Sequence, residues 1–255
     1  MILALDIGNT NIVIGTIEND TILFTGRLAT DKLKTSDEYA LLFSGMLAMN
    51  GTDIEDIDGV IISSVVPPLI LTLRRAIKKL TEIEPMILGP GLKTGLNIKI
   101  DNPAQLGSDQ VADAVAAIGK YKLPCIILDM GTATTVSVID RNKNYLGGLI
   151  IPGIRISQDA LSSQTSQLPR ISLEKPEKVV GKNTIDCMKS GAMYGTASMI
   201  DGLAERIEGE LGEEVTIVAT GGNSEAVVAV CKRNVIYDSN LLLDGLNMIY
   251  KKNIK

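Results

Sequence analysis

Two short turns of the form Asp-x-Gly recur along this chain in the same local order. Asp6-Ile7-Gly8-Asn9-Thr10 follows the apolar run 2–5 and precedes an alternating segment at 11–17. Asp129-Met130-Gly131-Thr132 lies 123 residues further on, between the apolar run 125–128 and a similar alternating segment at 134–139. An internal repeat constrains the architecture more than any single element, so the chain is expected to contain two similar units.

The pattern around both turns predicts a mixed α/β fold with flanking helices. Strands are expected at 2–5, 11–17, 21–28, 59–65, 85–88, 125–128, 134–139, 145–151 and 215–219. Helices are expected at 36–50, 69–81, 111–118, 186–211 and 241–252. The first is expected to be capped by Ser36 or Asp37, and Ser108 or Asp109 can start the third. Two similar lobes, 1–118 and 119–255, are expected to face a ligand cleft. The alternative is two coincidental hairpins, because Asp-Gly turns between strands are common.

The composition narrows the chemistry that such lobes can perform. The 255 residues are 45% apolar, carry a formal net charge of −5 and include no histidine. The acidic charge disfavours nucleic-acid partners. The missing histidine excludes Ser-His-Asp and Cys-His catalysis and histidine-ligated metals. Acid–base chemistry would therefore depend on carboxylates.

The cysteines and the N-terminus bear on the compartment. Cys125, Cys187 and Cys231 match no zinc or redox spacing and are expected to be small buried thiols in a reducing compartment. Only four apolar residues separate Met1 from Asp6, which is too short for a signal peptide. No run approaches the ~20 apolar residues of a membrane span. A cytoplasmic protein is expected.

Three glycine-containing turns have the character of phosphate sites. In the first, Gly8 lets backbone N–H groups approach an anion, and Asp6 can hold Mg²⁺ directly or through water. The second, from Asp129 to Thr135, offers hydroxyls in the same position of the repeat. The third, Thr220-Gly221-Gly222-Asn223, permits close approach of a ring or sugar and is not a Walker A loop. The first turn alone is equally compatible with an Asx-stabilised hairpin, and any one glycine-rich turn is weak evidence for a phosphate site.

Candidate residues for an acceptor lie outside these turns. Asp109, in Gly107-Ser108-Asp109-Gln110, is a candidate general base, although an acidic residue at a helix start is also an ordinary cap. Gly147 to Gly153 either closes a strand or exposes amides to a small polar compound. Thr184 is either a helix N-cap or a binding residue, and 157–166 is expected to be a surface loop.

Taken in order, these motifs resemble the type III pantothenate kinases, members of the superfamily of actin-like acetate and sugar kinases. The resemblance covers about residues 1–250. It rests on the two Asp-x-Gly turns, Gly147 to Gly153, Asn183-Thr184 with Ser190-Gly191, and Thr220-Gly221-Gly222. It implies duplicated actin-like (ribonuclease H-like) lobes, each with a mixed five-stranded sheet.

The resemblance also implies an activity and a set of roles. The activity is ATP-dependent phosphorylation of pantothenate to 4'-phosphopantothenate, the first step of coenzyme A biosynthesis, by a homodimer. Asp109 would be the general base, Asp6 would serve Mg²⁺ and Asp129 would hold K⁺ or NH₄⁺. The remaining roles fall into two groups, an ATP group of Asp6, Ile7, Gly8, Asn9, Thr10, Asn11, Thr132, Gly221 and Gly222 and a pantothenate group of Gly107, Ser108, Asp109, Gln110 and Thr184.

Two residues depart from the family pattern. Gln110 stands where the family usually has Arg, and Ile100 stands where it usually has Tyr. Loss of the Arg removes a fixed cation that can pair with a carboxylate or with developing phosphate charge. Two further hypotheses therefore stand beside pantothenate kinase: a kinase for another small hydroxy acid, and a non-catalytic regulator on the same scaffold.

Overall fold

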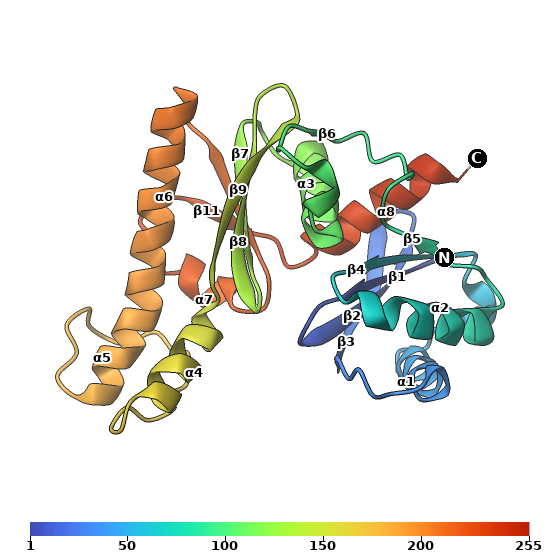
Figure 1. Ribbon diagram of the computed structural model, residues 1–255, viewed down its shortest axis with the longest axis horizontal. Helices are drawn as coiled ribbons and strands as arrows, with labels where there is room; N and C mark the ends of the chain where they lie inside the picture. Colours follow the sequence, from blue (N-terminus) through green and yellow to red (C-terminus); the bar gives the residue numbers. More distant parts are fainter. Residues whose placement is uncertain (255) are drawn as a thin grey trace. The chain divides into compact units, whose positions relative to one another are not determined.

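A computed structural model describes residues 1–254 and divides the chain into two compact units (Figure 1). Unit 1 comprises Met1–Gly95, Asn102–Ala116 and the segment from Leu241 onward, and unit 2 comprises Leu96–Asp101 and Ala117–Asn240. The expected boundary at 118/119 lies inside a helix. The C-terminal helix, expected in the second lobe, groups with the N-terminal segment because its apolar face packs there.

Unit 1 is built on a five-stranded sheet of order β3-β2-β1-β4-β5. The central strand β1 pairs antiparallel with β2 and parallel with β4. The strands are β1 (Ile2–Ile7), β2 (Asn11–Glu18), β3 (Thr21–Ala29), β4 (Gly59–Ser64) and β5 (Met86–Ile87).

Alternation along β1 divides the residues between the two faces of this sheet. Leu3, Leu5 and Ile7 are fully buried against helices α1 (Ser36–Met49) and α2 (Pro67–Thr81). The opposite face meets helix α8 (Leu241–Asn253), which contacts β1 and β4. In β1, Leu3, Leu5 and Ile7 therefore face the core formed with α1 and α2, while Ala4 and Asp6 lie on the other face of the sheet.

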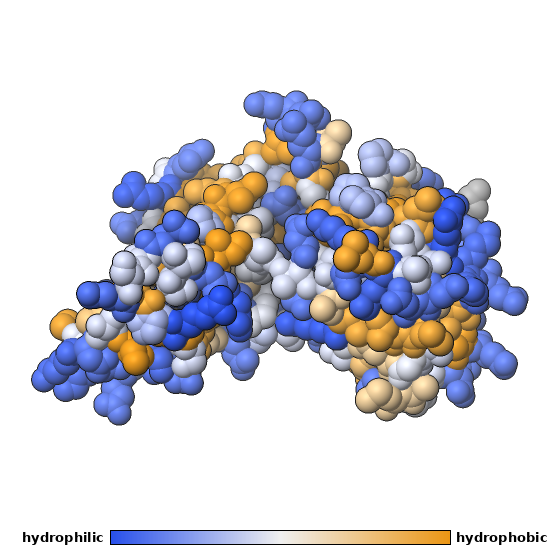
Figure 2. Space-filling model, turned by 60° about the horizontal axis from the view of Figure 1, so that its bottom comes forward, coloured by the Kyte–Doolittle hydropathy of each residue, from blue (hydrophilic) through white to orange (hydrophobic). Residues whose placement is uncertain are grey.

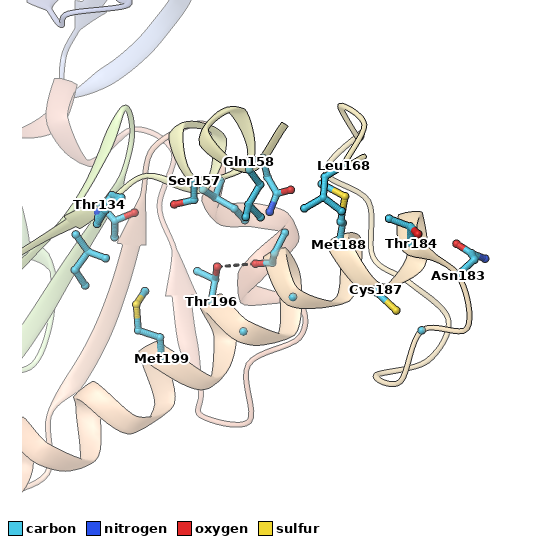
Figure 3. A pocket seen from close by; sticks show the side chains of 18 of the residues that line it. Thr134, Ser157, Gln158, Leu168, Asn183, Thr184, Cys187, Met188, Thr196 and Met199 are labelled. Carbon is cyan, nitrogen blue, oxygen red and sulfur yellow. Dashed lines mark hydrogen bonds between the residues drawn. The ribbon is translucent and has the colours of Figure 1, made fainter. Parts of the chain in front are cut away.

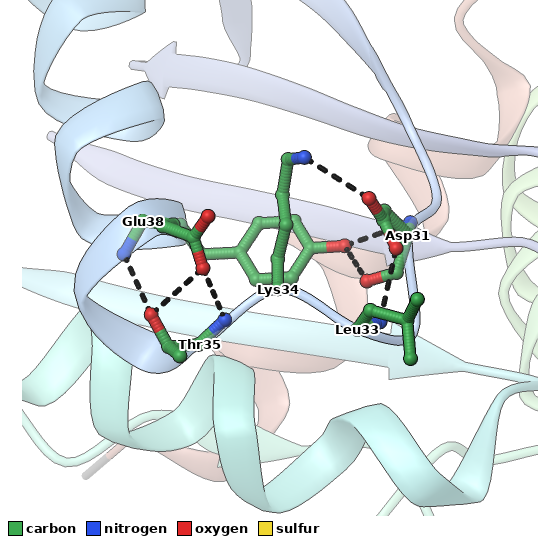
Figure 4. A network of polar contacts seen from close by, with 6 residues as sticks. Asp31, Leu33, Lys34, Thr35 and Glu38 are labelled. Atoms are coloured by element: carbon green, nitrogen blue, oxygen red, sulfur yellow. Dashed lines mark hydrogen bonds and ion pairs between the residues drawn. The ribbon is translucent and has the colours of Figure 1, made fainter.

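Polar contacts fix the start of α1 (Figure 4). Thr35 is the N-cap, and its hydroxyl accepts from the Glu38 backbone while the Glu38 carboxylate accepts from the Thr35 backbone. This is a capping box, so the expected cap at Ser36 or Asp37 was wrong by one residue or two. The Tyr39 hydroxyl, on the buried face of α1, donates to the Asp31 carbonyl at 2.7 Å. This contact ties the linker between β3 and α1 to the helix.

Unit 2 repeats the strand order and directions of unit 1. Its sheet has the order β11-β10-β7-β8-β9-β6, in which the first five strands correspond to β5, β4, β1, β2 and β3. The expected five-stranded duplication is confirmed, and the short strand β6 adds a sixth. The bounds are β6 (Asn97–Ile98), β7 (Cys125–Met130), β8 (Ala133–Ile139), β9 (Asn144–Pro152), β10 (Thr216–Thr220) and β11 (Val235–Tyr237).

The core of unit 2 lies between this sheet and a long interrupted helix. Ile126, Leu128 and Met130 of β7 pack with Ala197 and Ile200 in one buried cluster. The helix consists of α5 (Thr184–Ser190), a π-helical turn (Gly191–Gly195) and α6 (Thr196–Leu211). The remaining helices of the chain are α3 (Ser108–Lys120), α4 (Ile154–Gln164) and α7 (Ser224–Val228).

Three local expectations require correction. The segment 157–166, expected as a surface loop, is largely helix α4, which buries Ile154 against the sheet. Thr184 is the first residue of α5, and Asn183 is its N-cap. Cys187 is exposed, whereas Cys125 is buried as expected. None of the helices in residues 1–254 combines the length and apolar character that a membrane span requires.

Candidate functional site

The first Asp-x-Gly turn joins β1 to β2 and presents polar groups to solvent. Gly8 N–H donates to the Asn11 carbonyl at 3.0 Å, and the Thr30 hydroxyl donates to the Gly8 carbonyl at 2.7 Å. Asn9, Thr10 and Asn11 are exposed. The backbone of the turn is therefore held from β3 while its side chains remain accessible. Ile7 can offer only its backbone to a ligand, because its side chain lies in the core.

Asp6 and Ser63 are aligned on neighbouring strands. They are register partners in the parallel pair β1–β4, so both side chains project from the sheet face opposite α1 and α2. Ser63 is fully buried, and its hydroxyl lies 3.0 Å from the hydroxyl of Ser108, the first residue of α3. The hydrogen bond between Ser63 and Ser108 thus connects the strand beside Asp6 to the start of α3.

Asp109 stands in the first turn of α3 and is partly buried. Burial raises the pKa of its carboxyl above the ordinary 3.8, although hydrogen bonds from the backbone N–H groups of residues 109 and 110 lower it in part. A Cβ at Gly107 would collide with Oδ1 of Asp109, so this carboxylate uses space that only glycine leaves. A carboxylate with a raised pKa is a better proton acceptor than an exposed one.

The second Asp-x-Gly turn is enclosed by two glycines from distant parts of unit 2. Gly221 has φ of +91°, and a Cβ there would lie 2.6 Å from Oδ1 of Asp129. A Cβ at Gly153 would collide with the carbonyl oxygen of Thr132. The second and third phosphate-type turns and the end of the Gly147–Gly153 segment therefore meet around Asp129.

A polar pair extends this cluster. The Asn223 side chain donates to the Met130 carbonyl at 3.3 Å, and Nε of Arg155 donates to the Asn223 amide oxygen at 3.0 Å. Arg155 is exposed and stands in the first turn of α4. It is a cation beside the second turn that the sequence analysis did not single out. Its position two residues after Gly153, at the start of a helix, was the available signal.

A cavity of about 920 Å³ adjoins the same cluster in unit 2 (Figure 3). It runs from Thr134 of β8, past Gln158 of α4, to Thr184 at the start of α5. Its other lining residues are mostly apolar or small and include Ile151, Leu161, Met188, Gly191, Ala192, Gly195 and Met199. Lys182 is the one charged residue in the lining as described over residues 1–254. The cavity suits a small amphipathic compound with an anionic end.

The predicted site residues fall into two groups. Unit 1 holds residues 6–11 and 107–110, and unit 2 holds Asp129, Thr132, Thr184, Gly221 and Gly222. Gly147 and Gly148 do not expose amides to a ligand, since they lie within β9 and pair with Val138 and Ser137 of β8. Ile100 belongs to unit 2, where it neighbours Gly147, whereas Gln110 belongs to unit 1.

The described residues also bear on metals. Among residues 1–254 no three or more carboxylate, thiol or imidazole side chains gather in a cation cage. Mg²⁺ bound with ATP needs no such cage, because it keeps several waters and takes phosphate oxygens with one or two carboxylates. Asp6 next to an exposed polar turn fits that kind of binding, and the Asp129 carboxylate near the end of β7 offers oxygen ligands to a monovalent cation.

Comparison with solved structures agrees with the fold. A Baf family transcriptional activator from Campylobacter jejuni superposes with a TM-score of 0.61 at 20% identity, covering 98% of both chains. A ROK family glucokinase from Streptomyces griseus, solved with glucose and AMPPNP, gives 0.51 at 14% identity, covering 98% of this chain and 97% of its own. At these identities the likeness establishes the actin-like kinase fold alone.

Comparison with protein sequences identifies the family. The family model for type III pantothenate kinase matches residues 2–206. The type III pantothenate kinase of Halalkalibacterium halodurans is 47% identical over 254 residues, covering 100% of both chains. That of Bacillus cytotoxicus is 44% identical over 253 residues, covering 99% of this chain and 97% of its own. This chain belongs to the type III pantothenate kinase family.

Proposed function

We propose that this protein transfers the γ-phosphoryl group of ATP to the hydroxyl of pantothenate, yielding 4'-phosphopantothenate and ADP, the first step of coenzyme A biosynthesis. Family membership over the full chain supports the reaction. The observation that carries the mechanism is in unit 1. There Asp109 lies in the first turn of α3, whose first residue, Ser108, is hydrogen-bonded to Ser63, the register partner of Asp6.

Asp109 acts as the general base. Its carboxylate orients the pantothenate hydroxyl and accepts the proton as the hydroxyl oxygen bonds to the γ-phosphorus. The bond from that phosphorus to the β,γ-bridging oxygen breaks, and ADP departs with its electron pair. Because phosphoryl transfer depends mainly on positioning and charge stabilisation, the fixed backbone around Asp109 matters as much as its basicity.

Nucleotide binding is assigned to the glycine turns, each of which is described within its own unit. The short polar side chains of Asn9, Thr10 and Asn11 and the N–H groups of Asn9 and Thr10 serve the phosphates, and Gly8 allows the close approach of the backbone. Thr132, Gly221 and Gly222 contribute from unit 2. Asp6 serves Mg²⁺, and Asp129 serves K⁺ or NH₄⁺. When bound, these cations neutralise phosphate charge.

The acceptor is held by two sets of residues. Gly107, Ser108 and Gln110 flank the base in unit 1, and Thr184, also assigned to the acceptor, lines the cavity of unit 2. The Ser108 hydroxyl is fully hydrogen-bonded within the protein, so its part in acceptor binding is through the backbone.

We also propose a cytoplasmic homodimer. Exposed apolar side chains occur in both units, with exposed fractions of 92% for Leu33 in unit 1 and 79% for Val180 in unit 2. Apolar surface is interspersed with hydrophilic side chains on the face shown in Figure 2. The homodimer is therefore proposed from family membership. The free state of all three cysteines supports a reducing compartment.

Gln110 and Ile100 motivate a second candidate, a kinase for another small hydroxy acid. The third, a ligand-binding regulator, draws on the fold shared with the Campylobacter jejuni protein. A coupled assay with ATP, Mg²⁺, K⁺ and a panel of hydroxy acids separates the three. Pantothenate as the best acceptor supports the proposal. A better hydroxy acid supports the second candidate, and nucleotide binding without turnover of any acceptor supports the third.

A further inference from the structure

Three serines form a closed hydrogen-bonded group between β4 and α3. The Ser108 hydroxyl donates to the Ser64 carbonyl at 3.1 Å and accepts from the Ser64 N–H at 3.0 Å. The third contact of the Ser108 hydroxyl is with the Ser63 hydroxyl at 3.0 Å. Since the single proton of Ser108 is committed to the Ser64 carbonyl, Ser63 must be the donor in this contact.

The hydrogen-bonding capacity of Ser108 is therefore complete: one donor and two acceptor positions are all used. The two bonds to the Ser64 backbone fix the first residue of α3 against the end of β4. The bond from Ser63 adds a contact to a residue that is 0% exposed and cannot reorient toward solvent. A hydroxyl with three such partners holds its backbone in one place.

The position of the Ser63–Ser108 contact matters because both serines lie next to proposed site residues. Ser63 is the register partner of Asp6, and Ser108 directly precedes Asp109. The hydroxyl pair thus joins the strand position proposed for phosphate and Mg²⁺ to the helix that carries the proposed base. Both carboxylates belong to unit 1, so the connection lies within one compact unit.

We propose that Ser63 and Ser108 are positioning residues for phosphoryl transfer, which hold the start of α3 so that Asp109 keeps a fixed place relative to Asp6. The inference rests on the proposed function, in which Asp109 is the base. Ser108 contributes more than Ser63, because its hydroxyl makes three of the contacts and Ser63 makes one. Neither hydroxyl needs to touch a substrate for this role.

The test measures steady-state kinetics with ATP and pantothenate for Ser108→Ala, Ser63→Ala and the double variant. Displacement of a reacting group by about 1 Å costs up to roughly a hundredfold in rate. We expect kcat of Ser108→Ala to fall between about tenfold and a hundredfold, with KM for ATP unchanged. Ser63→Ala loses less, and the double variant is no slower than Ser108→Ala because the Ser63 hydroxyl acts through its contact with Ser108. Ser108→Thr, which keeps a hydroxyl, restores kcat.

Two controls separate positioning from general loss of stability. Ser137→Ala removes a comparable buried hydroxyl contact, the 3.0 Å pair of Ser137 with Tyr145 in unit 2, and should leave kcat within twofold of wild type. Melting curves of all variants show which are folded. If Ser108→Ala does not fold, Ser63→Ala decides, because it leaves both bonds of Ser108 to Ser64 in place.

Asp109→Asn separates the positioning role of the serines from the base role of Asp109, on which it rests. If that variant is inactive and the folded serine variants keep wild-type kcat, the positioning role is overturned while the base assignment stands. If Asp109→Asn retains wild-type turnover, both the base assignment and the positioning role are overturned. Equal losses of kcat in Ser137→Ala and Ser108→Ala would also overturn the positioning role, since a general stability effect would then account for both.

Discussion

Gly221 leaves the space that the carboxylate of Asp129 occupies: a Cβ at Gly221 would lie 2.6 Å from Oδ1 of Asp129. The two residues come from parallel strands whose ends are aligned, since Thr220 is the register partner of Asp129. The glycine also adopts φ of +91°, which residues with a Cβ rarely adopt. Two independent constraints therefore favour glycine at this position.

Gly221→Ala should displace Asp129 and weaken nucleotide use. We expect kcat/KM for ATP to fall by about tenfold to a hundredfold, because one misplaced group in a binding site has that effect. Gly212→Ala is the matched control, with a similar φ of +72° and no neighbour within 4 Å of the added Cβ. It should lower the free energy of unfolding by about 1–2 kcal/mol and leave the kinetics unchanged. Equal kinetics in the two variants would contradict the interpretation.

Asp109→Asn should lower kcat by about 10²- to 10⁴-fold, the usual contribution of a general base. The same change should raise the melting temperature at neutral pH. Burial raises the folded-state pKa of Asp109 above 3.8, so the ionised carboxylate destabilises the fold once the pH exceeds its unfolded-state value. The stability gain of the Asn variant should therefore disappear as the pH falls below about 4. Melting curves across pH check this, and a gain that persists in acid would contradict it.

Gly107→Ala tests the space that the proposed base requires. Its Cβ would collide with Oδ1 of Asp109, so the carboxylate must move or the helix start must shift. We expect kcat to fall by about tenfold or more with KM for ATP unchanged. Gly45→Ala, in α1 with open space at the Cβ position, is the control and should keep full activity.

The two glycines of the π-helical turn allow the cavity of unit 2 to be narrowed without strain. Gly191 and Gly195 have ordinary helical dihedrals, both line the cavity, and an added Cβ meets nothing within 4 Å. Alanine at either site should raise the free energy of unfolding by about 0.5–1 kcal/mol. If the cavity takes the acceptor, Gly195→Leu should raise KM for pantothenate several-fold and leave KM for ATP unchanged. Gly202→Leu, on the same helix outside the cavity lining, is the control.

Asp129→Asn should abolish the response of activity to K⁺. The carboxylate supplies the only formal negative charge proposed for that cation, and an amide holds a monovalent ion more weakly. Initial rates titrated with KCl against choline chloride at constant ionic strength measure the effect. An undiminished response to K⁺ would exclude Asp129 as the cation ligand.

Most of the fold was predictable because the repeat has strong local signals. The apolar strands and both Asp-x-Gly turns lie where the sequence indicated, and their strand order is duplicated. Helix α4 was missed because its segment is rich in Ser, a residue that favours caps and turns when considered alone. Burial of Ile154 at its start, a tertiary effect, overrides that preference.

The candidate site was predictable in its residue types and less so in its internal connections. Asp109 could be recognised at a helix start, but the role of Ser63 depends on strand register, which no local pattern in β4 reveals. Arg155 reaches the second turn only through Asn223, from a segment 68 residues distant along the chain. Such contacts arise from packing, not from local propensity.

The assembly of unit 1 from three separated stretches has a consequence for biosynthesis. Helix α8 supplies Leu241, Leu243 and Leu246 to its interior, and all three are buried. During translation unit 2 has its main stretch complete by residue 240, whereas unit 1 still lacks this helix. The interior of unit 1 can therefore be completed only after α8 has been synthesised, later than the main stretch of unit 2.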